Sequence, residues 1–179
     1  KRDWSSDVCS SDLAEVKVGA VSGLDEIFAN EEHGNREFVF SETARTGKTR
    51  KMIWVSEPDK IPPFLIQNKQ RLLQRKIRNF DESNWWEWGR GYPENNRERV
   101  YVNAKTRYEK PFFMSNCRNF DGSVLALFPK SQINLQDFVH DLNRIPWDEY
   151  GFFCDGRFIF SQRSLENTLL PEYMTKYLN

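Results

Sequence analysis

The sequence predicts an α+β fold in which mainly antiparallel strands combine with one long amphipathic helix, at about residues 64–80, and short C-terminal helices. Two observations support this class. Short β-rich runs recur at irregular intervals, without the regular strand and helix alternation of a parallel sheet. One central stretch repeats apolar residues at helical spacing. Hydrophobic residues make up 39% of the 179 residues, which is enough for a single core of this size.

The first part of the chain predicts a strand, a short helix and a hairpin. EVKVGAVSG (15–23) is typical of a strand that enters a glycine turn, and LDEIF (24–28) of a short helix. REFVF (36–40) and KMIWV (51–55) are β-rich and flank SETARTGKTR. We expect these two runs to pair as a hairpin around a long basic loop.

The long helix is predicted from LIQNKQRLLQRKIRNF, which follows two prolines. Ile66, Leu73, Ile77 and Phe80 recur at spacings of seven, four and three, so they fall on one helical face. Lysines and arginines occupy most of the other positions. The stretch therefore predicts an amphipathic helix with a basic outer face.

The second half predicts further strands and short helices. Strands are expected at 99–108, 111–115, 121–131 and 156–161. Short helices are expected at 135–143 and 147–150, and a C-terminal helical stretch at 164–178 is interrupted at Pro171.

Residues 1–13, KRDWSSDVCSSDL, show neither helical nor strand periodicity, and nothing in them predicts packing. Arg2 to Leu13 can also be back-translated into a stretch that resembles a widely used short-read sequencing adapter. We therefore expect residues 1–13 to be adapter-derived or disordered rather than native. The native part is then 14–179, and a further domain is expected to be missing upstream.

The net charge of zero conceals an asymmetry. Residues 45–110 hold sixteen Lys or Arg against eight Asp or Glu, a net charge of +8, whereas residues 14–44 and 111–179 carry −5 and −2. A basic middle between acidic flanks is expected where one face meets a polyanion. The plain alternative is a solvated surface with an uneven charge distribution.

Known catalytic patterns fail on this chain. RTGKT (45–49) ends like a phosphate-binding loop, but the glycine that this motif needs five places before Gly47 is replaced by Glu42. IPPF (61–64) approaches the Asn/Asp-Pro-Pro-aromatic tetrapeptide of amino methyltransferases, yet Ile61 has no hydrogen-bond acceptor. His33 and His140 stand far apart, and no metal site is predicted. We expect no catalytic residues, metal or cofactor in this chain.

With catalytic motifs excluded, the remaining candidate site is a surface that recognises nucleic acid. The hairpin loop is rich in cations that neutralise phosphates, and the WWEW run combines stacking surfaces with a guanidinium. Arginine pairs with guanine and asparagine with adenine, so Asn103 and Arg107 are candidates for reading base edges. The candidate DNA contacts are Arg45, Lys48, Arg50, Lys51, Trp86, Trp88, Arg90, Arg99, Asn103, Lys105 and Arg107. At least one tryptophan of the WWEW run is also expected to anchor the core.

Several segments resemble one protein family: VKVGAVSGLDEIF, REFVFSETARTGKTRKMIW, RVYVNAKTR, PFF, FDGSVLALFPK and FSQRSLENTLLP. Together they resemble the C-terminal specificity region of bacterial adenine-N6 DNA methyltransferases of type II restriction-modification systems. In that family a strand and turn of the form VG-x-x-SG, followed by an acid or amide and an aromatic, opens the target-recognition region. Residues 18–23, Asp25 and Phe28 fit this form.

The resemblance implies that residues 14–179 are a target-recognition domain and that the missing upstream domain binds S-adenosylmethionine and transfers the methyl group. It implies double-stranded DNA as the partner, allows for a cognate restriction endonuclease, and predicts a cytoplasmic bacterial protein. Two cysteines beyond residue 13, with no CxxC spacing, agree with a reducing compartment. No apolar run predicts a membrane span. Three alternatives stay open: the recognition part of a fused restriction-modification enzyme, an RNA-binding module, and a protein-interaction domain.

Overall fold

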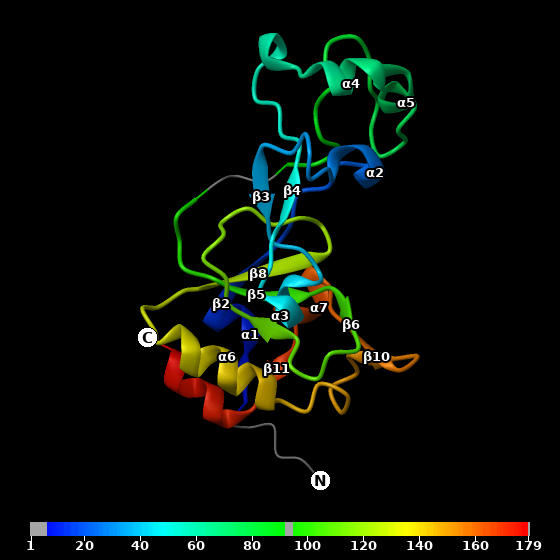
Figure 1. Ribbon diagram of the computed structural model, residues 1–179. Helices are drawn as coiled ribbons and strands as arrows, with labels where there is room; N and C mark the ends of the chain where they lie inside the picture. Colours follow the sequence, from blue (N-terminus) through cyan, green and yellow to red (C-terminus); the bar gives the residue numbers. More distant parts are fainter. Residues whose placement is uncertain (1–6, 92–94, 179) are drawn as a thin grey trace.

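A four-stranded antiparallel sheet forms the centre of the protein. The computed structural model describes residues 7–91 and 95–178 (Figure 1). The strand order is β2-β8-β5-β7, with every ladder antiparallel; the strands are β2 (Ala14–Val18), β8 (Val124–Pro129), β5 (Val100–Asn103) and β7 (Phe112–Phe113). The predicted α+β class with antiparallel pairing is therefore confirmed.

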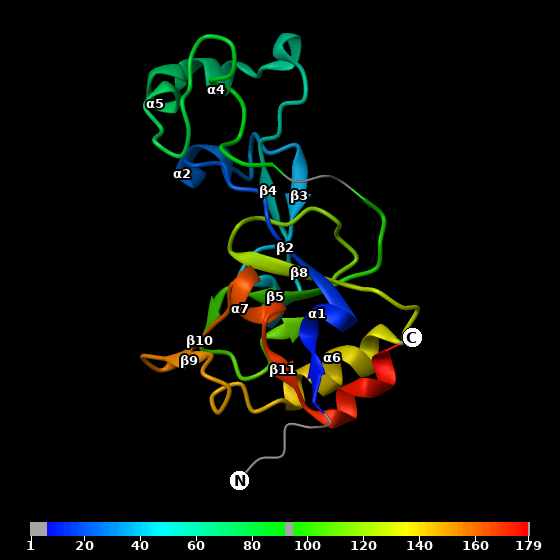
Figure 2. The ribbon, with the colours of Figure 1, turned by 180° about the vertical axis from the view of Figure 1, so that it is seen from behind.

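Both faces of this sheet are covered, which explains the nearly continuous apolar run of β8. Leu125 and Leu127 pack into one core, whereas Ala126 and Phe128 pack into another on the opposite face. Several short elements cover the first face (Figures 1 and 2). They are β1 (Val8–Cys9), α1 (Ser10–Leu13), α6 (Leu135–Arg144), α7 (Gln162–Glu166), β11 (Leu169–Leu170) and the 3-10 helix Glu172–Tyr177.

Besides the β1–β11 pair, the described residues form two further small sheets. β3 (Arg36–Phe38) pairs with β4 (Arg50–Met52), as the sequence predicts, and α3 (Thr43–Thr46) lies within the loop that connects them. The second small sheet has the order β6-β10-β9, from β6 (Lys105–Thr106), β10 (Arg157–Ile159) and β9 (Phe153–Cys154).

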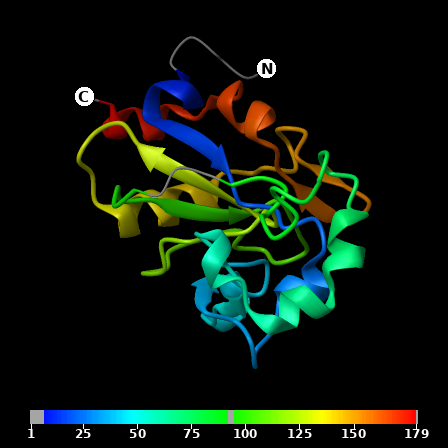
Figure 3. The same cartoon turned by 90° about the horizontal axis from the view of Figure 1, so that it is seen from above.

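A second lobe extends from the β3–β4 end of the molecule (Figure 1; Figure 3 looks down on it). We call residues 24–30 and 53–91 the distal lobe. It contains α2 (Asp25–Phe28), α4 (Pro63–Gln67), α5 (Lys69–Leu73) and the 3-10 turn Pro58–Lys60, around a core of its own. The chain enters it through the VGAVSG turn. A Cβ at Gly19 would lie 1.9 Å from the Asp121 carbonyl oxygen, and Gly23 has φ of 86°, a conformation that favours glycine.

The predicted long helix at 64–80 is wrong. Instead, α4 and α5 are two short helices that meet at Asn68, and the chain leaves helical geometry after Leu73. Leu65 and Leu72 are fully buried, while Ile66 and Ile77 are 55% and 43% exposed. The buried set is shifted by one position because packing against the tryptophans of the distal lobe, and not the heptad-like spacing, orients these turns. The longest helix of the described residues is α6, and 147–150 forms turns in place of the predicted helix.

The expectation that residues 1–13 do not pack is also wrong for the described part of that segment. β1 pairs with β11, and Val8 and Leu13 are 6% and 2% exposed within the main core. The partner strand lies some 160 residues away in sequence, so local periodicity contains no signal for it. Residues 1–6, including Trp4, lie outside the described residues, and the adapter origin stays a prediction.

Candidate nucleic-acid interface

Four of the predicted DNA contacts meet in one cleft of about 410 Å³, which we call the 103–107 cleft. The end of β5 supplies Asn103, β6 supplies Lys105, and Arg107 follows directly after β6. From the hairpin loop, α3 supplies Arg45. The short antiparallel ladder with β10 holds this segment in place. Two segments about 60 residues apart thus build a single basic cleft. The sequence predicts these residues as one group of candidate DNA contacts, but it does not show that they share a cleft.

Asn103 is the fixed point of the cleft. Its side chain is 3% exposed, and its amide nitrogen donates to the Ser41 carbonyl oxygen at 2.8 Å, which ties the hairpin loop to β5. The amide oxygen has no hydrogen-bond partner within the described part of the chain. A buried, unpaired polar atom is costly and unusual in a folded protein, so this oxygen is an unused acceptor in the lining of the cleft.

The cations of the cleft are unequal. Arg45 forms an exposed ion pair with Glu42 one turn away. Lys105 and Arg107 are exposed and have no ion pair with any residue described by the structure. These two side chains are therefore the cations of the cleft that can meet an incoming anion without first breaking a salt bridge.

The hairpin cations do not act as one loop. Lys48 follows α3 and is exposed, whereas Arg50 and Lys51 belong to β4. Arg50 pairs with Asp121 at 2.6 Å and Asp25 at 3.1 Å, and its guanidinium lies over the Phe40 ring. Two carboxylates thus already neutralise Arg50, and its contact with DNA stays a prediction. Lys48 and Lys51 stay available on the hairpin.

The tryptophans do not form a stacking surface. Trp85, Trp86 and Trp88 are 6%, 8% and 5% exposed and make up much of the distal-lobe core. Trp88 also donates from its indole nitrogen to the Ile53 carbonyl oxygen at 2.9 Å. The predicted base contacts of Trp86 and Trp88 are wrong, because both rings are buried in the core, where large apolar rings are more stable than in solvent. Arg90 itself is exposed, and its guanidinium donates to the Gly19 carbonyl oxygen at 3.2 Å.

Arg99 is a structural residue and not the predicted DNA contact. It is 3% exposed, lies over the Phe128 ring, and donates to the main-chain carbonyl oxygens of Asn95, Arg97 and Arg118. Its Nε and both terminal nitrogens thus donate within the protein, including to the Asn95 side-chain oxygen at 3.1 Å, and the side chain is buried away from a nucleic acid. Sequence reasoning placed this arginine on the surface because it lies in a polar, charged stretch.

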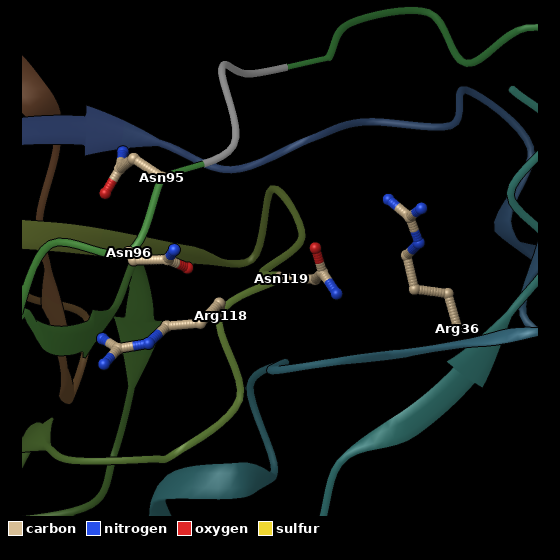
Figure 4. A pocket seen from close by; sticks show the side chains of 5 residues that line it. All are labelled: Arg36, Asn95, Asn96, Arg118 and Asn119. Carbon is tan, nitrogen blue, oxygen red and sulfur yellow. The ribbon is translucent and has the colours of Figure 1, made fainter.

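The sequence missed a second site, which we call the polar pocket (Figure 4). It has a volume of about 520 Å³ and draws its side chains from β3, from the segment before β5 and from the loop between β7 and β8. The residues are Arg36, Asn95, Asn96, Arg118 and Asn119. The Asn95-Asn96 and Arg118-Asn119 pairs in polar loops could have indicated a binding site. The local sequence does not show that these two loops lie side by side.

Much of the basic charge in residues 45–110 is neutralised within the distal lobe. Four of its cations have carboxylate partners: Lys60 with Glu57, Lys69 with Glu82, Arg71 with Glu26, and Arg78 with Glu87. Arg97, nearer the sheet, pairs with Glu15. Glu57, Glu82 and Glu87 are already counted in the net charge of +8, but Glu15 and Glu26 lie outside residues 45–110 and lower the effective charge of this region further. Among the described residues, exposed cations without an ion pair include Lys48 and Lys51 on the hairpin, Lys105 and Arg107 in the 103–107 cleft, and Lys76 and Arg90 in the distal lobe.

The Ile61–Phe64 segment does not fit the Asn/Asp-Pro-Pro-aromatic tetrapeptide of amino methyltransferases. In the Ile61–Phe64 segment, the Phe64 ring stacks on His33 with centroids 4.4 Å apart, so it is not free to stack on a base, and Ile61 has no acceptor. The described residues contain no group of three His, Cys, Asp or Glu side chains placed to hold a metal ion. Across the same residues, no helix is both long and apolar enough to cross a membrane.

Comparison with known proteins finds a similar fold in a solved structure. The chain matches no protein-family model and no curated protein. Its fold is similar to that of a solved structure of the Type IIL restriction-modification enzyme MmeI in complex with DNA, with a TM-score of 0.58 at 10% sequence identity. The match covers 86% of this chain and 24% of that protein, so the chain spans about a quarter of its length.

Proposed function

We propose that this chain is a recognition module that grips the backbone of duplex DNA and reads base edges beside it. The observation that carries the proposal is the 103–107 cleft, which the unpaired cations Lys105 and Arg107 line together with the buried amide of Asn103. Lysine and arginine neutralise phosphates, while asparagine and arginine pair with the edges of adenine and guanine. The similar fold in a restriction-modification enzyme bound to DNA supports the proposal.

At a finer level, we propose that the parent protein is a site-specific adenine-N6 DNA methyltransferase of a restriction-modification system. This chain would recognise the target, and a domain upstream would bind S-adenosylmethionine and transfer the methyl group. The sequence resemblance alone supports the methyltransferase chemistry, and a cognate endonuclease partner belongs to the same proposal. A fused restriction-modification enzyme is the alternative that uses the same recognition module.

Binding to duplex DNA as a function of salt tests the module. Affinity should fall steeply as salt rises, because each neutralised phosphate releases counterions. Replacing Lys105 and Arg107 together with glutamine should weaken binding and lower the slope of log affinity against log salt by about two. Lys130→Gln is the matched control, since Lys130 is exposed and lies outside the cleft. Salt-independent binding, or a double variant that binds like wild type, would overturn the proposal.

Single-stranded RNA is the comparison ligand. The RNA alternative depended on tryptophans that stack on unpaired bases, and the burial of Trp86 and Trp88 removes that support. We expect duplex DNA to bind more tightly than RNA of the same sequence. The reverse preference would replace DNA recognition by RNA binding, and binding to neither at low salt would favour a protein-interaction domain.

A further inference from the structure

The polar pocket has a composition that differs from the 103–107 cleft. Two guanidinium groups and three side-chain amides line it, and no carboxylate, lysine or aromatic ring is among its described lining residues. Figure 4 shows Asn119 between Arg36 on one side and Asn96 and Arg118 on the other. Guanidinium and amide are the groups that form paired hydrogen bonds with base edges.

The buried Arg99 holds together the two segments that form the side of the pocket opposite Arg36 (Figure 4). Its guanidinium donates to the Asn95 carbonyl oxygen at 2.7 Å and to the Arg118 carbonyl oxygen at 2.9 Å. Arg118 donates in turn to the Arg97 carbonyl oxygen at 3.0 Å. These bonds join the segment before β5 to the loop before β8. The pocket is therefore preorganised, which lowers the entropy cost of binding.

Two side chains of the pocket remain exposed with unused hydrogen-bonding groups. The amide of Asn96 has no hydrogen-bond partner among the residues the structure describes. Arg118 uses one terminal nitrogen on Arg97, and its other terminal nitrogen and Nε form no further bond within the described ranges. One amide and one two-donor edge thus face solvent from adjoining loops.

We propose that Asn96 and Arg118 are specificity-determining residues that read purine edges in duplex DNA, with Arg99 as the positioning residue. The inference rests on the proposed function and extends it to a site outside the 103–107 cleft. An asparagine amide matches the amino group and N7 of adenine, and two guanidinium donors match N7 and O6 of guanine. A phosphate group is a less suitable ligand, because it would use the two arginines but not the three asparagine amides. A base flipped out of the duplex needs aromatic walls, which the described lining does not supply.

Selection from a randomised duplex pool with the full chain tests this inference. Asn96→Ala and Arg118→Gln should each lower affinity for the selected duplex about tenfold or more, and each should lose discrimination at one base pair. Their affinity for unrelated duplexes should stay near that of wild type. Asn116→Ala and Arg157→Gln are matched controls, because both residues are exposed and lie outside the pocket. Thermal unfolding of each variant verifies that it is folded.

The outcomes separate the two proposals. If wild-type protein binds no duplex, the proposed function fails and this inference fails with it. If binding is salt-dependent but both variants select the wild-type sequence, only this inference is overturned. Equal weakening by Arg118→Gln on every duplex would make Arg118 a phosphate contact and would also overturn it.

Discussion

The guanidinium of Arg75 lies 3.8 Å from the centre of the Phe80 ring. Arg75 is 7% exposed and has no carboxylate partner within the described residues. It donates instead to the carbonyl oxygens of Leu72, Ser22 and Trp85, the last two at 2.6 Å. Burial lowers the pKa of Arg75 to about 10, which still leaves it charged at neutral pH. This one side chain joins two segments of the distal lobe to the VGAVSG turn.

Replacing Arg75 by lysine should therefore destabilise the protein although the charge is kept. Lysine lacks the planar fork, so at least one buried carbonyl oxygen loses its donor, and we expect a loss of about 2–3 kcal/mol in the free energy of unfolding. Denaturant unfolding measures this change. Lys76→Arg is the control, because Lys76 is exposed and adjacent. A stability equal to wild type for Arg75→Lys would refute the role of the guanidinium geometry.

The ion pair of Arg50 with Asp121 connects the hairpin to the segment that leads into β8. Asp121 is 3% exposed, and its second oxygen accepts hydrogen bonds from the main chain and side chain of Ser123. Asp121→Asn should lower stability by about 1–3 kcal/mol, since it leaves Arg50 partly buried beside a neutral group. Asp59→Asn, on an exposed turn, should change little. Equal melting temperatures for the two variants would contradict this prediction.

Asp141 should make stability depend on acid pH. Burial acts to raise the pKa of its carboxyl, but hydrogen bonds from Lys176 and Tyr177 outweigh burial, so the pKa lies below its ordinary value. A lowered folded-state pKa contributes stability above the unfolded value of about 4, and that stability is lost as pH falls through the folded pKa. Asp141→Asn should flatten the fall in stability below pH 4. An unchanged acid profile in this variant would assign the effect to other carboxyls.

Leu13 tests whether the N-terminal segment is part of the fold. Its side chain is 2% exposed in the main core, so Leu13→Ala should lower stability by about 2–4 kcal/mol. Leu169→Ala is the control, since Leu169 lies in β11, the strand that pairs with β1, but is 41% exposed. Deletion of residues 1–6 should cost less than deletion through Leu13. If removal of all thirteen residues left stability unchanged, the packing of β1 and α1 would have no energetic weight.

Local sequence determined the elements whose signal is local. Alternating or continuous apolar runs predicted β5 and β8, and two β-rich runs around a polar loop predicted the β3–β4 hairpin. The glycines of the VGAVSG turn also predicted a turn locally, because close approach at Gly19 and the positive φ of Gly23 favour glycine. In the 103–107 cleft, the cluster of cations and Asn103 was also predicted from residue types alone.

Tertiary structure decided which polar and aromatic side chains are exposed. The sequence predicts surface contacts for Arg50, Arg99 and Trp86. In the structure, Asp121 neutralises Arg50, and packing against segments distant in the chain buries Arg99 and Trp86. The polar pocket exists because Arg99 joins two loops that contain no sign of each other. Composition and periodicity encode what each segment prefers, whereas burial and pairing depend on which segments meet, and that is set by packing of the whole chain.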